Sequence, residues 1–220
     1  MTSNKTAGVA ALLMALIYIG AFVYFGALLG FPDSKHADVV MPFLAQHHHA
    51  LWLVYFMIYV AFGVLLALLV EAIETRLGKS PTSSYHQLLR VGTLFGKVWV
   101  CLVIASGMIA TIGMSRAIGL MEESNEEAFR LWGVVSMLVE SLGGGNELVG
   151  GLWVLVISIV ALQRCVFTKV INYLGCVVGV AGIATVYPAD VFTEIFGLTQ
   201  IIWFSFVGVG LIKSAKQTGL

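Results

Sequence analysis

Long apolar stretches recur along nearly the whole chain, and they constrain its fold more than any other feature. Of the 220 residues, 59% are hydrophobic and only 11% are charged, and the mean hydropathy is +0.95. A soluble domain has about 25% charged residues, and a soluble core of this size cannot cover so much apolar surface. We therefore expect lipid to surround most of the chain, which predicts an all-α, polytopic membrane protein with a single domain over residues 1–220.

Hydrophobic length and helix-breaking residues predict six transmembrane helices. A helix needs about 20 apolar residues to cross the hydrocarbon core of a bilayer. Residues 30–49, which include Pro32 and Pro42, are expected to form a loop between the first and second spans. The predicted spans cover residues 7–29, 50–73, 91–114, 147–163, 170–187 and 194–212.

The segment from residue 125 to 163 is mostly apolar, but it is too long for one simple crossing. Ser124 and Glu127 form a capping-box pattern, which predicts the start of a helix. The glycines at 143–145 predict its end, and Asn146 is a suitable N-cap for the next helix. We expect the first of these helices to lie on the outer face or to enter the membrane halfway, with the glycine break near the outer boundary.

Lysine and arginine residues predict the orientation, because cytoplasmic segments of membrane proteins carry an excess of both. Segments rich in Lys and Arg alternate regularly with segments that are poor in them only if residues 125–163 cross the membrane once. That count places both termini in the cytoplasm. A seventh crossing would place Lys213 and Lys216 outside. The residues assigned to the cytoplasmic side are Lys5, Arg76, Lys79, Arg90, Arg164, Lys169, Lys213 and Lys216.

The glycine break carries carboxylates on both sides, and two interpretations stay open. In the first, Glu140, Asn146 and Glu147 provide oxygen atoms for a ligand or an ion in a polar cavity, because carboxylates inside a membrane often mark such sites. In the second, the break is an elbow at the membrane interface, where water hydrates both glutamates. Glu147 would also be a favourable anion at the N-terminus of the following helix.

Lys97 is the one charged residue in the third predicted span. We expect it to form an ion pair with Glu71 of the second span, which would tie two helices together. Its long stem also allows the ammonium group to reach the headgroup region without a partner. A role in a proton or substrate path is the third alternative.

Histidines gather before the second predicted span, where His47, His48 and His49 follow His36. Histidine is the commonest transition-metal ligand, so a metal site on the outer face is one hypothesis. Three consecutive histidines point in different directions on a helix, however, so such a site needs further ligands. A haem would need axial ligands within the spans. Because no histidine lies inside a predicted span, we expect no haem and predict no other cofactor.

Several segments resemble a bacterial family of integral membrane proteins known as domain of unknown function 4386. They are QHHHALWLVYFMIYVAFGVLLALLVEAI, GGLWVLVISIVALQRCVFTKVINYLGCVVGVAGIATVYP and the final EIFGLTQIIWFSFVGVGLIK. The resemblance implies six spans and a hydrophilic elbow over residues 163–169, followed by a glycine-containing helix. It implies a location in the bacterial inner membrane, but no activity and no site residues.

These observations favour a non-enzymatic protein, since serine-hydrolase, metalloprotease and phosphate-binding motifs are absent from the sequence. The leading hypothesis is an accessory subunit or a binder of an apolar ligand, whose partners are the lipid bilayer and other membrane proteins or further copies of itself. The alternatives are a small transporter or ion-coupled carrier using Glu140 and Glu147, and a metal-binding protein using the histidine triplet. The zero net charge gives no basic surface for nucleic acid.

Overall fold

The structure, a computed structural model, describes residues 3–78, 85–144, 147–187 and 189–217. All regular elements in these ranges are helices, which confirms the predicted all-α class. Lys79, Gly145 and Asn146 lie outside the described residues. In chain order the α-helices are α1 (Ser3–Val23), α2 (Ala37–Tyr55), α3 (Phe62–Leu77), α4 (His86–Leu120), α5 (Asn125–Val139), α6 (Leu148–Gln163), α7 (Lys169–Ala184) and α8 (Asp190–Gln217), and three short π-helices are η1 (Tyr24–Leu28), η2 (Phe56–Ala61) and η3 (Glu140–Gly144).

Five helical stretches among the described residues are long and apolar enough to cross a membrane. The remaining apolar helix, α7, has 16 residues, fewer than the roughly 20 that a full crossing needs. The structure therefore gives five such stretches, and the predicted span over residues 170–187 is not confirmed. The five are Asn4–Leu28, Ala37–Leu77, His86–Leu120, Asn125–Gln163 and Val191–Ala215.

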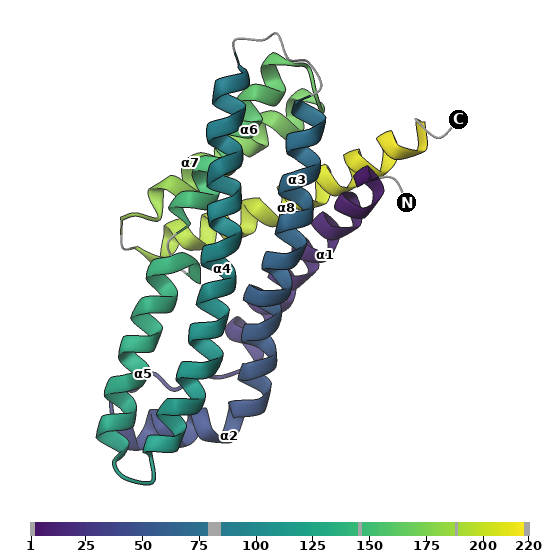
Figure 1. The fold of residues 1–220 in the computed structure, drawn as a ribbon. Helices are drawn as coiled ribbons and strands as arrows, with labels where there is room; N and C mark the ends of the chain where they lie inside the picture. The colour runs from purple at the N-terminus through teal and green to yellow at the C-terminus, as the bar shows by residue number, and fades with distance from the viewer. Residues whose placement is uncertain (1–2, 79–84, 145–146, 188, 218–220) are drawn as a thin grey trace.

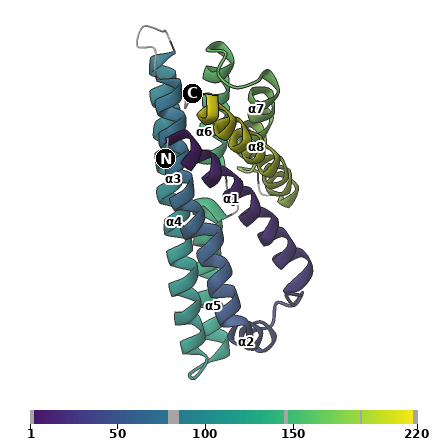
Figure 2. The same cartoon turned by 90° about the vertical axis from the view of Figure 1, so that its right-hand side faces the viewer.

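Helix α4 runs through the whole length of the molecule and organises the other helices (Figure 1). With α2, α5 and the adjoining part of η2, it encloses one apolar cluster at the end that Figure 1 shows below. A second and larger cluster joins α4 to α1, α3, α6, α7 and α8 in the other half. Figure 2 shows α1 and α8 side by side on one flank, with both termini close together.

The exposed apolar side chains of α4 match the thickness of a bilayer. The first and last of them are Val91 and Ile112, and at a rise of about 1.5 Å per residue they lie about 32 Å apart along the helix. The hydrocarbon core of a bilayer is about 30 Å thick. The depth of any residue that packs against α4 can therefore be judged from its neighbour on α4.

Helix α2 begins at Ala37, so the predicted loop over residues 30–49 is wrong for its second half. Pro42 lies inside the helix, although proline removes a backbone donor there. Buried Val40, Met41 and Leu44 pack in the lower apolar cluster, and this packing outweighs the effect of one proline. Figure 1 shows α2 across the lower end of the bundle before the chain rises into α3.

Helix α5 starts where the capping box predicts, because the Glu127 backbone N–H donates to Ser124 Oγ at 3.4 Å. It then runs lengthwise beside the lower half of α4, and α6 continues beside the upper half (Figure 1). Helix α5 therefore lies along the bundle, as the predicted helix that enters the membrane halfway would, and not across its end as a helix on the outer face would. The two helices together make one passage along α4, which is compatible with the charge alternation.

Glycines allow several helices to approach closely. A side chain added at Gly151 of α6 would come within 2.7 Å of backbone atoms of Gly182 in α7. Gly8 of α1 and Gly208 of α8 are similarly close, since a side chain on either would lie 2.8 Å from the carbonyl oxygen of the other. Such contacts between small residues are typical of helix packing in membranes.

Candidate functional site

The glycine break lies beside the middle of the apolar stretch of α4, whereas the sequence predicts it near the outer boundary of the membrane. Gly143, at the end of η3, has a φ of 152°, a conformation that side-chain-bearing residues rarely adopt. A side chain added there would first meet Val103 of α4, which lies about midway between Val91 and Ile112. Irregular backbone at such a depth is tolerated only where protein or a cavity covers it.

Glu147 follows this break and is buried, with 8% of its surface exposed. Its Oε2 accepts a hydrogen bond from the Trp99 indole N–H at 3.0 Å, and its backbone N–H donates to Thr185 Oγ1 at 2.8 Å. It occupies the N-cap position of α6, where the helix dipole favours an anion. The interpretation in which water hydrates both glutamates is therefore wrong for Glu147.

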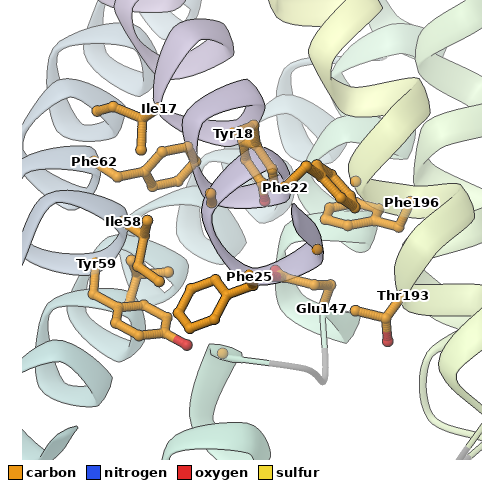
Figure 3. Close-up of a pocket in the computed structure, with 15 residues that line it drawn as sticks. Ile17, Tyr18, Phe22, Phe25, Ile58, Tyr59, Phe62, Glu147, Thr193 and Phe196 are labelled. Carbon is orange, nitrogen blue, oxygen red and sulfur yellow. The ribbon is translucent and has the colours of Figure 1, made fainter. Parts of the chain in front are cut away.

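Glu147 lines a cavity of about 470 Å³ that is otherwise mostly apolar and aromatic. Figure 3 shows its side chain reaching among the rings of Tyr18, Phe22 and Phe25. The volume lies within the range of about 300–1,000 Å³ that is usual for small-molecule sites. The lining residues are Ile17, Tyr18, Ala21, Phe22, Phe25, Gly26, Ile58, Tyr59, Phe62, Val103, Gly143, Glu147, Thr193, Phe196 and Gly197.

All three π-helices of the described chain contribute to this cavity. Phe25 and Gly26 come from η1, Ile58 and Tyr59 from η2, and Gly143 from η3. A π-helical turn inserts one extra residue into an α-helix, so it shifts the direction in which side chains point, and such turns are frequent at functional sites. Two such turns, η1 and η2, and the kink at Gly143 in η3 converge on one space here, from three different parts of the sequence.

An apolar groove adjoins the cavity, between α1 with η1 on one side and η2 with its flanking helices on the other. Its volume is about 960 Å³, and none of the described residues that line it is charged. Ile17, Ala21 and Ile58 line both the groove and the cavity. Leu28 and Leu53 on its walls are largely exposed, so an apolar chain can pass from the surroundings of the protein toward the cavity.

Glu140 does not share the environment of Glu147. It is exposed and lines a smaller pocket of about 220 Å³, which has Phe25, Ile58 and Tyr59 in common with the cavity. The two carboxylates are thus in neighbouring spaces rather than in one site. Asn146, the third predicted oxygen donor, lies outside the described residues.

Lys97 pairs with Glu74 and not with the predicted Glu71, since its Nζ lies 2.9 Å from Glu74 Oε2. Side chains of an α-helix tilt toward its N-terminus, and the N-terminus of α4 lies at the α3–α4 end of the bundle (Figure 1). The long stem of Lys97 therefore extends toward that end, where Glu74 is the nearer carboxylate. This ion pair ties α3 to α4 and lies outside the cavity.

The histidines do not converge on one site, although the rings of His48 and His49 lie 5.3 Å apart between centroids. His47 stacks on Phe43 with ring centroids 4.1 Å apart, His48 Nε2 lies 3.1 Å from Ser115 Oγ of α4, and His36 is exposed before α2. His47, His48 and His49 belong to α2 rather than to a loop. Within the described residues, His, Cys, Asp and Glu side chains form no group of three or more that is arranged to hold a metal ion.

The sequence did not predict the residues that contact Glu147. Trp99 and Thr185 lie far from Glu147 in the sequence, and Tyr18 and Tyr59 read as ordinary aromatic residues of membrane helices. The chain matches no protein-family model, no curated protein and no solved structure. The chemistry of the cavity is therefore the guide to function.

Proposed function

We propose that this chain is a non-enzymatic membrane protein that binds an apolar ligand in the cavity around Glu147. The observation that carries the proposal is the cavity itself, of about 470 Å³, with aromatic walls and one buried carboxylate. Binding sites for small molecules are mostly apolar and have a few fixed polar groups. The Glu147 carboxylate, which the Trp99 indole N–H holds in place, is such a group.

Filling the cavity with a side chain tests this proposal. Gly26 lines the cavity, and a side chain added there has nothing within 4 Å, so Gly26→Leu occupies ligand space without a clash. Gly133 of α5 also has nothing within 4 Å but does not line the cavity, which makes Gly133→Leu the matched control.

Each variant is purified in mild detergent, and bound molecules are extracted and identified by mass spectrometry. We expect an apolar molecule that copurifies with the wild type and with Gly133→Leu, and is reduced at least about tenfold in Gly26→Leu. Equal amounts of every extracted apolar molecule in the three proteins would contradict the proposal.

An ion-coupled carrier is the second candidate, and the position of Glu140 favours it. Its pocket shares Phe25, Ile58 and Tyr59 with the Glu147 cavity, so an exposed carboxylate and a buried one lie in adjoining spaces. Intramembrane carboxylates are frequent parts of proton and ion paths. In proteoliposomes with an imposed membrane potential, a trapped pH-sensitive dye would then report proton entry that Glu147→Gln abolishes and Glu122→Gln, at an exposed glutamate, preserves.

We further propose the bacterial inner membrane as the location, with the α3–α4 end of the bundle in the cytoplasm. The helix ends on that side, which Figure 1 shows at the top, carry Arg76, Arg90, Arg164 and Lys169. The connection between α4 and α5 at the opposite end is acidic, with Glu122 and Glu123. Membership of the family that the sequence resembles stays a prediction.

A further inference from the structure

The charge of Glu147 points to the kind of ligand that the cavity accepts. Among the described residues no Lys, Arg or His forms an ion pair with this carboxylate, and none lines the cavity. Its Oε2 receives the Trp99 N–H, and the residue lines the cavity. A buried carboxylate without a counter-charge is unfavourable, so a cationic ligand would supply what the protein lacks.

The rings around Glu147 favour the same kind of ligand. Tyr18, Phe22 and Phe25 line the same cavity as its side chain, as Figure 3 shows, and Tyr59 and Phe62 line it too. Aromatic faces attract cations, and quaternary ammonium groups are recognised by several such rings together. One carboxylate inside a set of aromatic rings is therefore suited to an organic ammonium group.

The groove indicates the rest of the ligand. It has room for an apolar chain and meets the cavity at Ile17, Ala21 and Ile58. In the part of the chain that the structure describes, neither space is lined by Lys or Arg, so a lipid phosphate would have no cationic partner there and would be repelled by Glu147. This disfavours a zwitterionic phospholipid and favours an amphiphile whose only charge is positive.

We propose that the ligand is a single-chain amphiphile with an ammonium head, which pairs with Glu147 among the aromatic rings while its tail lies in the groove between α1 and η2. This inference rests on the proposed function, because it names the ligand class of the same cavity.

Two probes of equal shape separate the effect of the positive charge of the ligand on binding from the effect of its apolar contacts. Dodecyltrimethylammonium carries the cation, and 2,2-dimethyltetradecane replaces its nitrogen with carbon. Binding of the radiolabelled cation to the full chain in phosphatidylcholine nanodiscs is measured by scintillation proximity, with empty nanodiscs subtracted. The radiolabelled isostere is measured in the same way.

We expect Glu147→Gln to weaken binding of the cation at least about tenfold, which is about 1.4 kcal/mol, and to change binding of the isostere less than about twofold. Phe25→Leu is expected to weaken cation binding about threefold, within the range of one cation–π contact, and to spare the isostere. Glu122→Gln, at an exposed glutamate, leaves both unchanged. The Phe25 variant keeps the test decisive if Glu147→Gln does not fold.

Two outcomes separate this inference from the proposed function. If the isostere binds and neither Glu147→Gln nor Phe25→Leu weakens the cation more than the isostere, the ammonium inference is overturned while apolar binding stands. If neither probe binds and no molecule is lost from Gly26→Leu in the copurification experiment, both proposals are overturned.

Discussion

At the scale of single residues, the hydrogen bond from Trp99 to Glu147 joins α4 to the start of α6 at the centre of the molecule. Trp99→Phe keeps an aromatic ring but removes the N–H, and it leaves the carboxylate with one partner fewer. A hydrogen bond of this kind contributes about 1–2 kcal/mol between membrane helices. We therefore expect Trp99→Phe to lower the free energy of unfolding by that amount, measured in mixed micelles titrated with sodium dodecyl sulfate.

Trp203 provides the control for the loss of ring volume in that substitution. It is buried to a similar degree, but its indole N–H has no hydrogen-bond partner among the described residues. Trp203→Phe thus removes the same atoms without removing a hydrogen bond. Equal destabilisation by the two substitutions would show that the Trp99 N–H contributes nothing to stability.

The ion pair of Lys97 and Glu74 lies at a partly exposed position, where such pairs contribute at most about 1 kcal/mol. A double-mutant cycle with Lys97→Gln and Glu74→Gln is expected to give a coupling energy of about 0.5 kcal/mol. The same cycle with Glu71→Gln is expected to give almost none, because Lys97 extends past Glu71. Stronger coupling to Glu71, measured by the same unfolding titration, would restore the pairing inferred from the sequence.

At the scale of helices, the crossing of α6 and α7 depends on the absence of a side chain at Gly151. Gly151→Ala would place a methyl group 2.7 Å from backbone atoms of α7, and backbone cannot move aside as a flexible side chain can. Overpacking of this kind costs about 1–3 kcal/mol, so the free energy of unfolding should fall by that amount.

Gly133 gives a control of opposite sign for that substitution. It lies inside α5 with open space around it, and alanine is favoured over glycine in a helix by about 0.8–1.0 kcal/mol. Gly133→Ala should therefore stabilise the protein slightly. If both substitutions stabilise the protein, helix propensity rather than close packing governs these positions.

The helices could be predicted from the sequence because their signals are local. Ser124 and Glu127 mark the start of α5, and the glycine break before Glu147 separates α5 from α6 as expected. The start of α2 could not be predicted, because packing of Val40, Met41 and Leu44 against distant helices outweighs the local signal of Pro42. A local sequence pattern gives no information about packing against helices that are distant in the sequence.

The candidate site could be predicted only in part, for the same reason. Glu147 stands out in the sequence as a carboxylate in an apolar segment, whereas its partners Trp99 and Thr185 come from α4 and from the end of α7. The depth of Glu147 depends on α5 lying along α4 rather than across the end of the bundle. That choice is made by packing between helices, which hydropathy does not report.

At the scale of the whole molecule, charge separates the two ends of the bundle. Arg164 and Lys169 flank the α6–α7 connection at one end, and Glu122 and Glu123 lie in the α4–α5 connection at the other. Because Lys and Arg are retained on the cytoplasmic side, we expect the α6–α7 connection inside the cell and the α4–α5 connection outside. The cavity and the groove would then lie between them, within the bilayer.

Two single cysteines test this orientation. Cys165 is exposed in the α6–α7 connection. The first variant carries Cys101→Ala and Cys176→Ala, which leaves Cys165 as its single thiol. The second also carries Cys165→Ser, and Glu123→Cys then places its single thiol at the opposite end. In intact spheroplasts a membrane-impermeant maleimide should label Glu123→Cys and should label Cys165 only after lysis. Labelling of both before lysis would mean that α5 and α6 do not make one passage across the membrane. The reverse pattern would invert the orientation, so that the acidic end would face the cytoplasm against the charge rule.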